Sequence, residues 1–318
     1  MTKHSPQSLL ERAAELYDFG ATLRAPPAAP PPPFEEAFEV AHRPAPAPVP
    51  AEPAAAPMVE VERPRVRPRA PGGVATIDRD ALVAAGFIVP GGMVTGLAEE
   101  ARLVKRQFLA GIERRVSQPE EKRRTVLITS AQPNEGKSFC AINLALSLSG
   151  ESDTEVLLVD GDFSKPDMLL TLGVQGGPGL VDALEDPDSD PEDFVIRTDV
   201  PGLALLPSGR KANNVPELLA SDRTREVLAK LNAGDRRRII LFDSPPALMA
   251  SPATVLSAHV GQALVVVRAD RTTEADLRET IGLLSGCDHV SLILNGAGMA
   301  VTGRRYGSYD GYGDDHGA

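Results

Sequence analysis

The chain has 318 residues, 42% of them hydrophobic and 24% charged, which is the composition of an ordinary soluble protein with one large domain or two small ones. Its net charge of -11, aromatic content of 4% and lack of tryptophan argue against a nucleic-acid-binding protein, which needs basic surfaces and stacking side chains. Two cysteines cannot form a disulfide framework, and no apolar run approaches the roughly 18 residues that span a bilayer. We therefore expect a protein of the reducing cytoplasm that is neither secreted nor membrane-spanning.

The first part of the chain differs in composition from the rest. Residues 1–24 contain a short amphipathic pattern in which Leu9, Leu10 and Leu16 share one helical face. Such a helix is either a frayed terminus or a docking helix for a partner or a membrane surface. Residues 25–73 hold 15 of the 29 prolines, interleaved with alanine, which predicts a disordered and partly polyproline II linker.

Residues 74–303 have the composition of a globular domain in which short apolar runs alternate with helical patterns. Near-continuous runs of Val, Ile and Leu separated by helices predict an α/β fold, a doubly wound parallel sheet covered on both faces. Ligands of such folds bind at the carboxyl ends of the strands. The expected strands are Thr125–Thr129, Val156–Asp160, Leu203–Leu206, Ile239–Asp243, Leu264–Arg268 and Val290–Asn295, and the expected helices are Leu97–Val116, Ser138–Leu148, Glu217–Leu231 and Glu274–Leu284.

The segment after the first expected strand is a candidate phosphate-binding loop. Residues 130–138, SAQPNEGKS, match the pattern Gly-x-x-x-x-Gly-Lys-Ser/Thr with Ala131 in place of the first glycine. In such a loop, backbone N–H groups face phosphate at a helix N-terminus, a lysine reaches the β- and γ-phosphates, and a hydroxyl binds Mg²⁺. Asn134 tolerates the left-handed conformation that glycine often supplies, and a chance turn is the alternative interpretation. The residues expected to bind ATP are Ala131, Gln132, Pro133, Asn134, Glu135, Gly136, Lys137, Ser138 and Phe139.

Two further strands end in carboxylates. One delivers Asp160 with Asp162 two residues later, and another delivers Asp243 before Ser-Pro-Pro. A single Asp there is often a cap or turn residue, but Asp beside a phosphate loop is how P-loop enzymes hold Mg²⁺ and position a nucleophile. We expect Lys137, Asp160, Asp162 and Asp243 to be catalytic, and Ser138, Asp162 and Asp243 to hold the metal. Asn295, which ends the last strand, is either an adenine contact or a β-turn residue.

The segments SAQPNEGKS, LLVDGD and IILFDSPP together resemble the bacterial tyrosine kinases, deviant-Walker P-loop NTPases unrelated in fold to eukaryotic protein kinases. The resemblance covers roughly Ala98 to Tyr312. It includes Glu99-Glu-Ala-Arg102-Leu-Val-Lys105, which is similar to the family's Glu-x-x-Arg-x-x-Arg oligomerisation helix, and also the segment ELLAS at 217–221. The proline-rich N-terminal extension resembles that of the tyrosine autokinases linked to exosortase and exopolysaccharide loci.

The resemblance implies an ATP- and Mg²⁺-dependent protein-tyrosine autokinase that regulates exopolysaccharide or capsule biosynthesis and export. In that role Asp160, with Asp162 beside it, orients or deprotonates the incoming tyrosine hydroxyl. Residues 304–318 lack an apolar pattern and are expected to form a flexible tail, for which a low-complexity Gly/Tyr segment is the alternative interpretation. The resemblance implies that the phosphate acceptors are Tyr306, Tyr309 and Tyr312, which stand where the family has its autophosphorylated cluster. It also implies that one subunit phosphorylates the tail of another.

The resemblance also implies partners and a location. It implies a homo-oligomer formed through the helix that carries Glu99, Arg102 and Lys105, and no nucleic acid. It implies a membrane activator of the chain-length-regulator (Wzz-like) type and a cognate phosphotyrosine phosphatase. The protein is then expected to be cytoplasmic and recruited to the inner face of the plasma membrane by its partner.

Two positions depart from the family pattern. The second acidic motif usually reads Asp-x-Asp-x-Arg, but Ser164 stands where the Arg is expected, and Lys165 follows it. Lys105 replaces the last Arg of the oligomerisation pattern, which keeps the charge but loses a bidentate fork. Two other functions stay open: a membrane-positioning or partition ATPase, which has an extra lysine where this chain has Gln132, and an inactive ATP-binding scaffold, which the intact loop lysine Lys137 disfavours.

Overall fold

The structure is a computed structural model that describes residues 73–92, 95–233 and 237–297. The expected helix of residues 1–24, the linker up to residue 72 and the tail with its three tyrosines lie outside the described residues. Within the described ranges, no helix combines the length and the apolar character that a membrane crossing requires.

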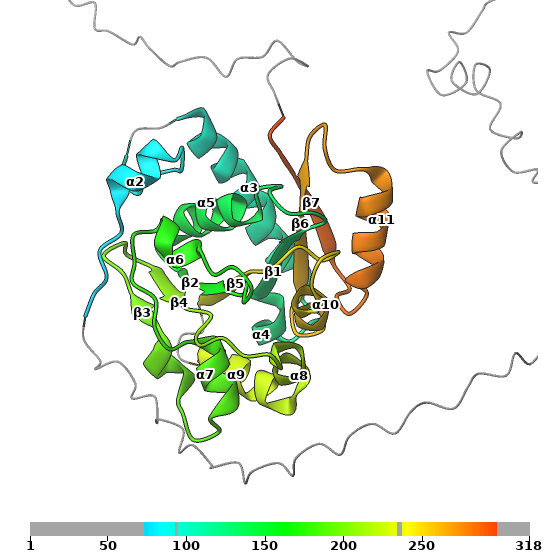
Figure 1. Ribbon diagram of the computed structural model, residues 1–318. Helices are drawn as coiled ribbons and strands as arrows, with labels where there is room; N and C mark the ends of the chain where they lie inside the picture. The colour runs from blue at the N-terminus through cyan, green and yellow to red at the C-terminus, as the bar shows by residue number, and fades with distance from the viewer. Residues whose placement is uncertain (1–72, 93–94, 234–236, 298–318) are drawn as a thin grey trace, which may run out of the picture. The chain divides into compact units, whose positions relative to one another are not determined.

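A seven-stranded sheet forms the centre of the described domain, with the order β3-β4-β2-β5-β1-β6-β7 (Figure 1). All neighbouring strands are parallel except β3 and β4, which pair antiparallel. The doubly wound α/β fold expected from the sequence is therefore confirmed. The strands are β1 (Thr125–Ser130), β2 (Glu155–Asp160), β3 (Ile196–Arg197), β4 (Leu203–Leu206), β5 (Arg238–Asp243), β6 (Gln262–Arg268) and β7 (Val290–Asn295).

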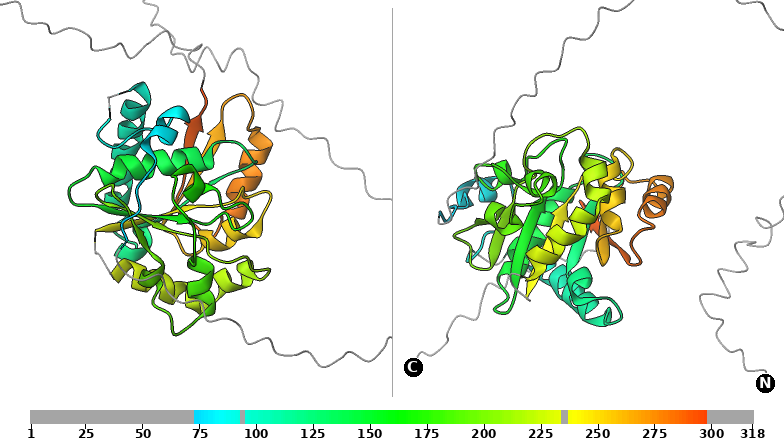
Figure 2. Two further views of the ribbon diagram at one scale, coloured as in Figure 1. Left: turned by 60° about the vertical axis from the view of Figure 1, so that its left-hand side comes forward. Right: turned by 90° about the horizontal axis from the view of Figure 1, so that it is seen from below.

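Helices cover both faces of this sheet (Figure 2). Hydrophobic side chains of α3 and α5 pack with the sheet residues of one face, while those of α7, α8, α9 and α10 pack with the other. The helices are α2 (Arg79–Ala84), α3 (Gly96–Arg114), α4 (Glu120–Arg123), α5 (Lys137–Ser149), α6 (Met168–Thr171), α7 (Leu180–Glu185), α8 (Val215–Ala220), α9 (Asp222–Ala233), α10 (Ser251–Ser257) and α11 (Glu274–Leu283), with a 3₁₀ turn at Pro191–Phe194.

Helix α5 is the element that fixes the phosphate-binding loop in the fold. Every residue from 141 to 149 is buried, because the helix lies between the sheet and α3. A helix that is mostly apolar around its whole circumference can be stable only in such a position. Phe108 and Ile112 of α3 complete the hydrophobic cluster on this face. The first turn of α5 is thereby held at the carboxyl edge of β1.

The structure corrects the sequence-based expectation in two places. The helix expected over Glu217–Leu231 is two helices, because Ser221 adopts an extended conformation between α8 and α9 and its hydroxyl donates to the carbonyl of Leu218 at 2.6 Å. Strand β3 and the short helices α2, α4, α6, α7 and α10 were not expected from the apolar pattern. Each has two to seven residues, and short elements leave little periodicity in a sequence.

Candidate active site

The loop between β1 and α5 has the conformation that phosphate binding requires. Asn134 and Gly136 have positive φ angles of 63° and 95°, so the left-handed conformation expected for Asn134 is confirmed. Lys137 is the first residue of α5, and among the described residues no side chain caps this helix and no acidic residue lies in its first turn. The first amide groups of α5 are therefore available to an anion, which the helix dipole also stabilises.

Asp160 and Asp243 end neighbouring strands and lie opposite each other in the parallel register of β2 and β5. Both residues are 1% exposed. Gly161 allows the chain to pass closely, since its N–H donates to the Asp243 carbonyl at 2.7 Å and a Cβ there would lie 3.0 Å from that oxygen. One oxygen of each carboxylate, Oδ2 of Asp160 and Oδ1 of Asp243, is buried without a hydrogen-bond partner in the described part of the chain.

Asp162 joins this pair of carboxylates to the loop lysine. The Nζ atom of Lys137 lies 2.9 Å from Oδ2 of Asp162, and both side chains are nearly buried. The other oxygen, Oδ1, accepts the Ser164 hydroxyl at 2.7 Å and the Lys165 N–H at 3.2 Å. The structure thus brings together Lys137, Asp160, Asp162 and Asp243, which come from three different strand ends, at one edge of the sheet.

Burial and mutual proximity set the protonation of these groups. Burial, together with the neighbouring Asp243, raises the pKa of Asp160 to about 7. Burial also raises the pKa of Asp243 to about 6, although Lys137 and the Ser138 hydroxyl act in the opposite direction. Burial lowers the pKa of Lys137, but the carboxylates of Asp243 and Asp162 outweigh it, so that the pKa lies above its ordinary value. The site therefore combines a charged lysine with carboxyl groups that exchange protons near neutral pH, as a general base must.

The donor set of this site fits Mg²⁺. The Ser138 hydroxyl is near enough to the Asp243 carboxylate to lower its pKa, and the Oδ1 atom of Asp243 is buried and unpartnered within the described residues. In the part of the chain that the structure describes, no three His, Cys, Asp or Glu side chains form a complete metal cage. Mg²⁺ does not need one, because it is usually bound by one or two carboxylates, water and substrate phosphates. Ser138 and Asp243 are therefore suitably placed ligands, whereas both oxygens of Asp162 are occupied by Lys137 and Ser164.

Asn295 lies on the loop itself. Its Nδ2 atom donates to the carbonyl oxygen of Glu135 at 2.8 Å. Glu135 is fully buried, its carboxylate accepting the Gln132 N–H at 2.8 Å and the Thr272 hydroxyl. The contacts of Glu135 with Thr272 and with Asn295 join residues more than 130 positions apart, and the sequence pattern gave no indication of them. The adenine contact of Asn295 stays a prediction.

No protein-family model matches the chain, but the curated proteins similar to it include tyrosine-protein kinases. The chain is 33% identical over 193 residues to EpsB of Ralstonia nicotianae and 31% identical over 188 residues to the tyrosine-protein kinase Wzc of Salmonella typhimurium. The matches cover 58% and 59% of this chain, but 25% of the length of each relative. The tyrosine-protein kinase YwqD of Bacillus subtilis is 28% identical over 60% of this chain and 76% of its own length.

A solved structure agrees with these relatives. The BceF tyrosine kinase domain superposes with a TM-score of 0.52 at 27% identity, covering 61% of this chain and 76% of that one. In sequence and in fold the chain is therefore similar to the bacterial tyrosine kinases, which are P-loop ATPases. The chain spans about a quarter of the length of EpsB and Wzc.

The chain differs from the bacterial tyrosine kinases at Ser164, and the structure shows what this residue contacts. Its hydroxyl donates to Asp162, so a neutral hydrogen bond stands where a guanidinium is expected. Lys165 does not take the place of that Arg at Asp162, because its Nζ atom lies 3.2 Å from Asp167 and its side chain is 79% exposed. The Oδ1 atom of Asp162 is therefore oriented by Ser164 and by the backbone of Lys165, while Lys137 contacts Oδ2.

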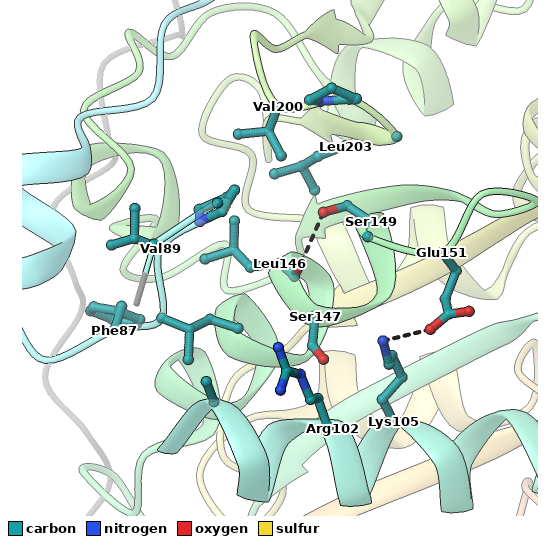
Figure 3. A pocket seen from close by; sticks show the side chains of 18 of the residues that line it. Phe87, Val89, Arg102, Lys105, Leu146, Ser147, Ser149, Glu151, Val200 and Leu203 are labelled. Carbon is teal, nitrogen blue, oxygen red and sulfur yellow. Dashed lines mark hydrogen bonds and ion pairs between the residues drawn. The ribbon is translucent and has the colours of Figure 1, made fainter. Parts of the chain in front are cut away.

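The family's oligomerisation pattern lies on α3, beside a groove of about 1400 Å³ (Figure 3). Glu99 and Arg102 form an exposed ion pair with each other, whereas Lys105 turns inward and its Nζ atom lies 2.5 Å from Glu151. The groove is lined by the start of β2 and by the end of α5, so it opens at the amino edge of the sheet, opposite to the phosphate-binding loop. It is therefore separate from the candidate nucleotide site.

Proposed function

We propose that the chain is a Mg²⁺- and ATP-dependent protein-tyrosine autokinase that phosphorylates the tyrosines of its own C-terminal tail. The observation that carries this proposal is the convergence of four residues, Lys137, Asp160, Asp162 and Asp243, around the uncapped N-terminus of α5. An uncapped helix terminus and a charged lysine suit a polyphosphate, and buried carboxylates with raised pKa values suit deprotonation of a hydroxyl.

In this mechanism the loop amides and Lys137 bind the phosphates of ATP, and Lys137 leaves Asp162 to do so. Ser138 and Asp243 would hold Mg²⁺, which would supply neutralisation of phosphate charge. The ionised Asp160 then accepts the proton of the incoming tyrosine hydroxyl. The tyrosine oxygen bonds to the γ-phosphorus while the bond to the bridging oxygen breaks, and ADP leaves. Catalysis of this kind consists mainly of positioning and charge stabilisation.

The acceptors proposed are Tyr306, Tyr309 and Tyr312, which lie outside the described residues. They are three of the chain's four tyrosines, and the fourth is Tyr17. Each phosphate adds about -1.5 to -2 charges near neutral pH. Phosphorylation therefore converts the tail into a strongly anionic segment that can regulate assembly by repulsion.

The experiment for this proposal is incubation of the purified chain with Mg-ATP, followed by mass-spectrometric mapping of phosphate. The expected result is phosphate on the three tail tyrosines and none after Tyr→Phe replacement of all three. Tyr17 serves as the internal control. Absence of phosphotyrosine from a chain that binds Mg-ATP would leave an ATP-binding scaffold as the function, and phosphate release without phosphotyrosine would indicate a partition-type ATPase.

The cellular role proposed follows the family resemblance. The autokinase would regulate exopolysaccharide or capsule biosynthesis and export from the cytoplasmic face of the plasma membrane. A membrane protein of the chain-length-regulator type would recruit and activate it, and a phosphotyrosine phosphatase would reverse the modification. Self-association through α3 would bring one subunit's tail to another's site, using the exposed Glu99 and Arg102 rather than the inward-facing Lys105.

A further inference from the structure

A buried carboxylate lies behind the phosphate-binding loop and takes no part in the mechanism above. Glu135 is 0% exposed, although it is charged and lies in a loop. Its Oε2 atom accepts the N–H of Gln132 at 2.8 Å, which closes the loop on itself. Burial of a carboxylate is costly unless its oxygens are hydrogen-bonded, so these contacts must be made whenever the loop has this conformation.

The second oxygen of Glu135 connects the loop to the segment between β6 and α11. Its Oε1 atom accepts the hydroxyl of Thr272. That hydroxyl oxygen in turn accepts the N–H of Arg268 at 2.8 Å, at the end of β6. A threonine hydroxyl has one proton, and here the accepted bond from Arg268 directs that proton toward Glu135. The hydrogen bonds thus run in one direction from β6 into the loop.

Asn295 makes the third connection, from the end of β7. Its Nδ2 atom donates to the Glu135 carbonyl at 2.8 Å, and its own backbone carbonyl accepts the N–H of Ala269 at 2.9 Å. Contact with the loop is close, because a Cβ at Gly136 would lie 2.0 Å from Nδ2 of Asn295. One of the two amide protons of Asn295 is therefore used by the loop backbone, immediately before the glycine whose φ is 95°.

We propose that Glu135, Thr272 and Asn295 form a brace that holds the phosphate-binding loop in its left-handed conformation, and that Asn295 is a positioning residue for phosphate rather than a contact for adenine. The inference rests on the proposed nucleotide site and adds a residue role to it. A brace acts on the loop amides, so its loss weakens binding of every ligand that carries the same phosphates. An adenine contact acts on one base only.

The test is the affinity of Asn295→Ala for Mg-ATP, Mg-GTP and Mg-tripolyphosphate, measured by calorimetry on the full chain. Loss of one hydrogen bond predicts about a 3- to 10-fold weaker affinity, and the brace predicts the same factor for all three ligands. A loss confined to ATP, with unchanged tripolyphosphate affinity, would overturn the brace and establish the adenine contact. Ser291→Ala is the matched control, since it removes one hydrogen bond, from Gln262 at 2.9 Å, at the other end of β7.

A second measurement does not depend on ligand binding. Hydrogen–deuterium exchange of residues 131–138 in the nucleotide-free chain should be faster in Asn295→Ala and in Thr272→Val than in the wild type, and unchanged in Ser291→Ala. Exchange at wild-type rates in both brace variants would refute the brace. If the wild type binds none of the three ligands while the brace variants still exchange faster, the proposed function fails and the brace stands.

Discussion

At the scale of single residues, the buried carboxyl of Asp160 sets how the nucleotide-free chain responds to pH. An aspartate in an unfolded chain has a pKa of about 3.9, whereas burial raises the pKa of Asp160 to about 7. Between these values the folded chain binds a proton that the unfolded chain has released. The free energy of unfolding must therefore fall as the pH rises from about 4 to about 7, and then level off.

Urea unfolding at about pH 5 and about pH 8 measures this dependence. We expect a lower midpoint at the higher pH for the wild type, and a smaller difference for Asp160→Asn, which cannot ionise. Asp243, whose pKa burial raises to about 6, adds to the fall in stability, whereas the pKa of His259, lowered by burial, opposes it. The pKa values of Asp199 and Asp276 are lowered by hydrogen bonds, so these two groups act below about pH 4. A wild-type midpoint that is equal or higher at pH 8 would contradict the assignment.

Lys137 and Lys165 both lie near Asp162, but we expect their substitution by Met to have different effects on nucleotide binding and on stability. Lys137→Met removes the cation beside the nearly buried Asp162, so we expect loss of Mg-ATP binding and about 1–3 kcal/mol of stability. Lys165→Met removes an exposed cation that pairs with Asp167, for which less than about 0.5 kcal/mol is expected. Calorimetric titration and urea unfolding of both variants test this pair. Nucleotide binding retained by Lys137→Met would refute the role of the loop lysine.

Ser164 predicts a rate effect with little change in stability. Ser164→Ala removes the 2.7 Å hydrogen bond to Asp162, while the Lys165 N–H still contacts the same oxygen. We expect autophosphorylation to slow by about 3- to 10-fold, because the carboxylate loses one of the groups that orient it. The rate of phosphotyrosine formation measures this, and Ser164→Thr should restore it. A rate equal to the wild type in Ser164→Ala would show that the hydroxyl orients nothing.

At the scale of elements, helix α3 supports α5 through one face and is exposed on the other. Phe108 is 4% exposed and belongs to the core, whereas Leu103 on the same helix is 53% exposed. Phe108→Ala is therefore expected to cost about 3–5 kcal/mol, and Leu103→Ala less than about 1 kcal/mol. Urea unfolding of the two variants provides the comparison. Equal losses would mean that α3 does not pack as described.

The elements that the sequence predicted well are those with long apolar patterns. Five of the six expected strands both begin and end within one residue of the observed ones, and β6 begins two residues earlier than expected. The break at Ser221 could not be predicted, because the apolar spacing of α8 continues into α9 and only the extended backbone of Ser221 separates them. Strand β3 has two residues, too few to show any alternation.

The candidate site was predictable in its strand ends and not in its supporting contacts. A strand followed by a glycine-lysine-serine segment, and strands ending in Asp, place Lys137, Asp160 and Asp243 at one edge of a parallel sheet from sequence alone. The contact of Glu135 with Thr272 joins residues 137 positions apart, and no local pattern indicates it. Asn295 was recognised by its place at a strand end, but its partner on the loop depends on how β7 is seated beside β6.

At the scale of the whole molecule, the strand order places the candidate nucleotide site and the groove beside α3 at opposite edges of the sheet. Because β1 lies between β5 and β6, and β5 beside β2, the loop and the carboxylates share the carboxyl edge of the sheet. The groove beside α3 opens at the opposite edge. An acceptor tyrosine must therefore approach the carboxyl edge, whereas α3 and its groove stay accessible to another subunit or partner.

The central claim is that this chain transfers phosphate to the tyrosines of a neighbouring copy, and a mixing experiment tests it most directly. Full-length Lys137→Met, which keeps its tail but lacks the loop lysine, is mixed with a wild-type truncation ending at Gly303, which has the site but no tail. With Mg-ATP, we predict phosphate on Tyr306, Tyr309 and Tyr312 of the full-length variant, read by mass spectrometry. If the full-length Lys137→Met variant carries no phosphate under conditions in which the wild type alone is phosphorylated, transfer between subunits is contradicted. If neither that variant nor the wild type carries phosphate, the kinase activity itself is contradicted.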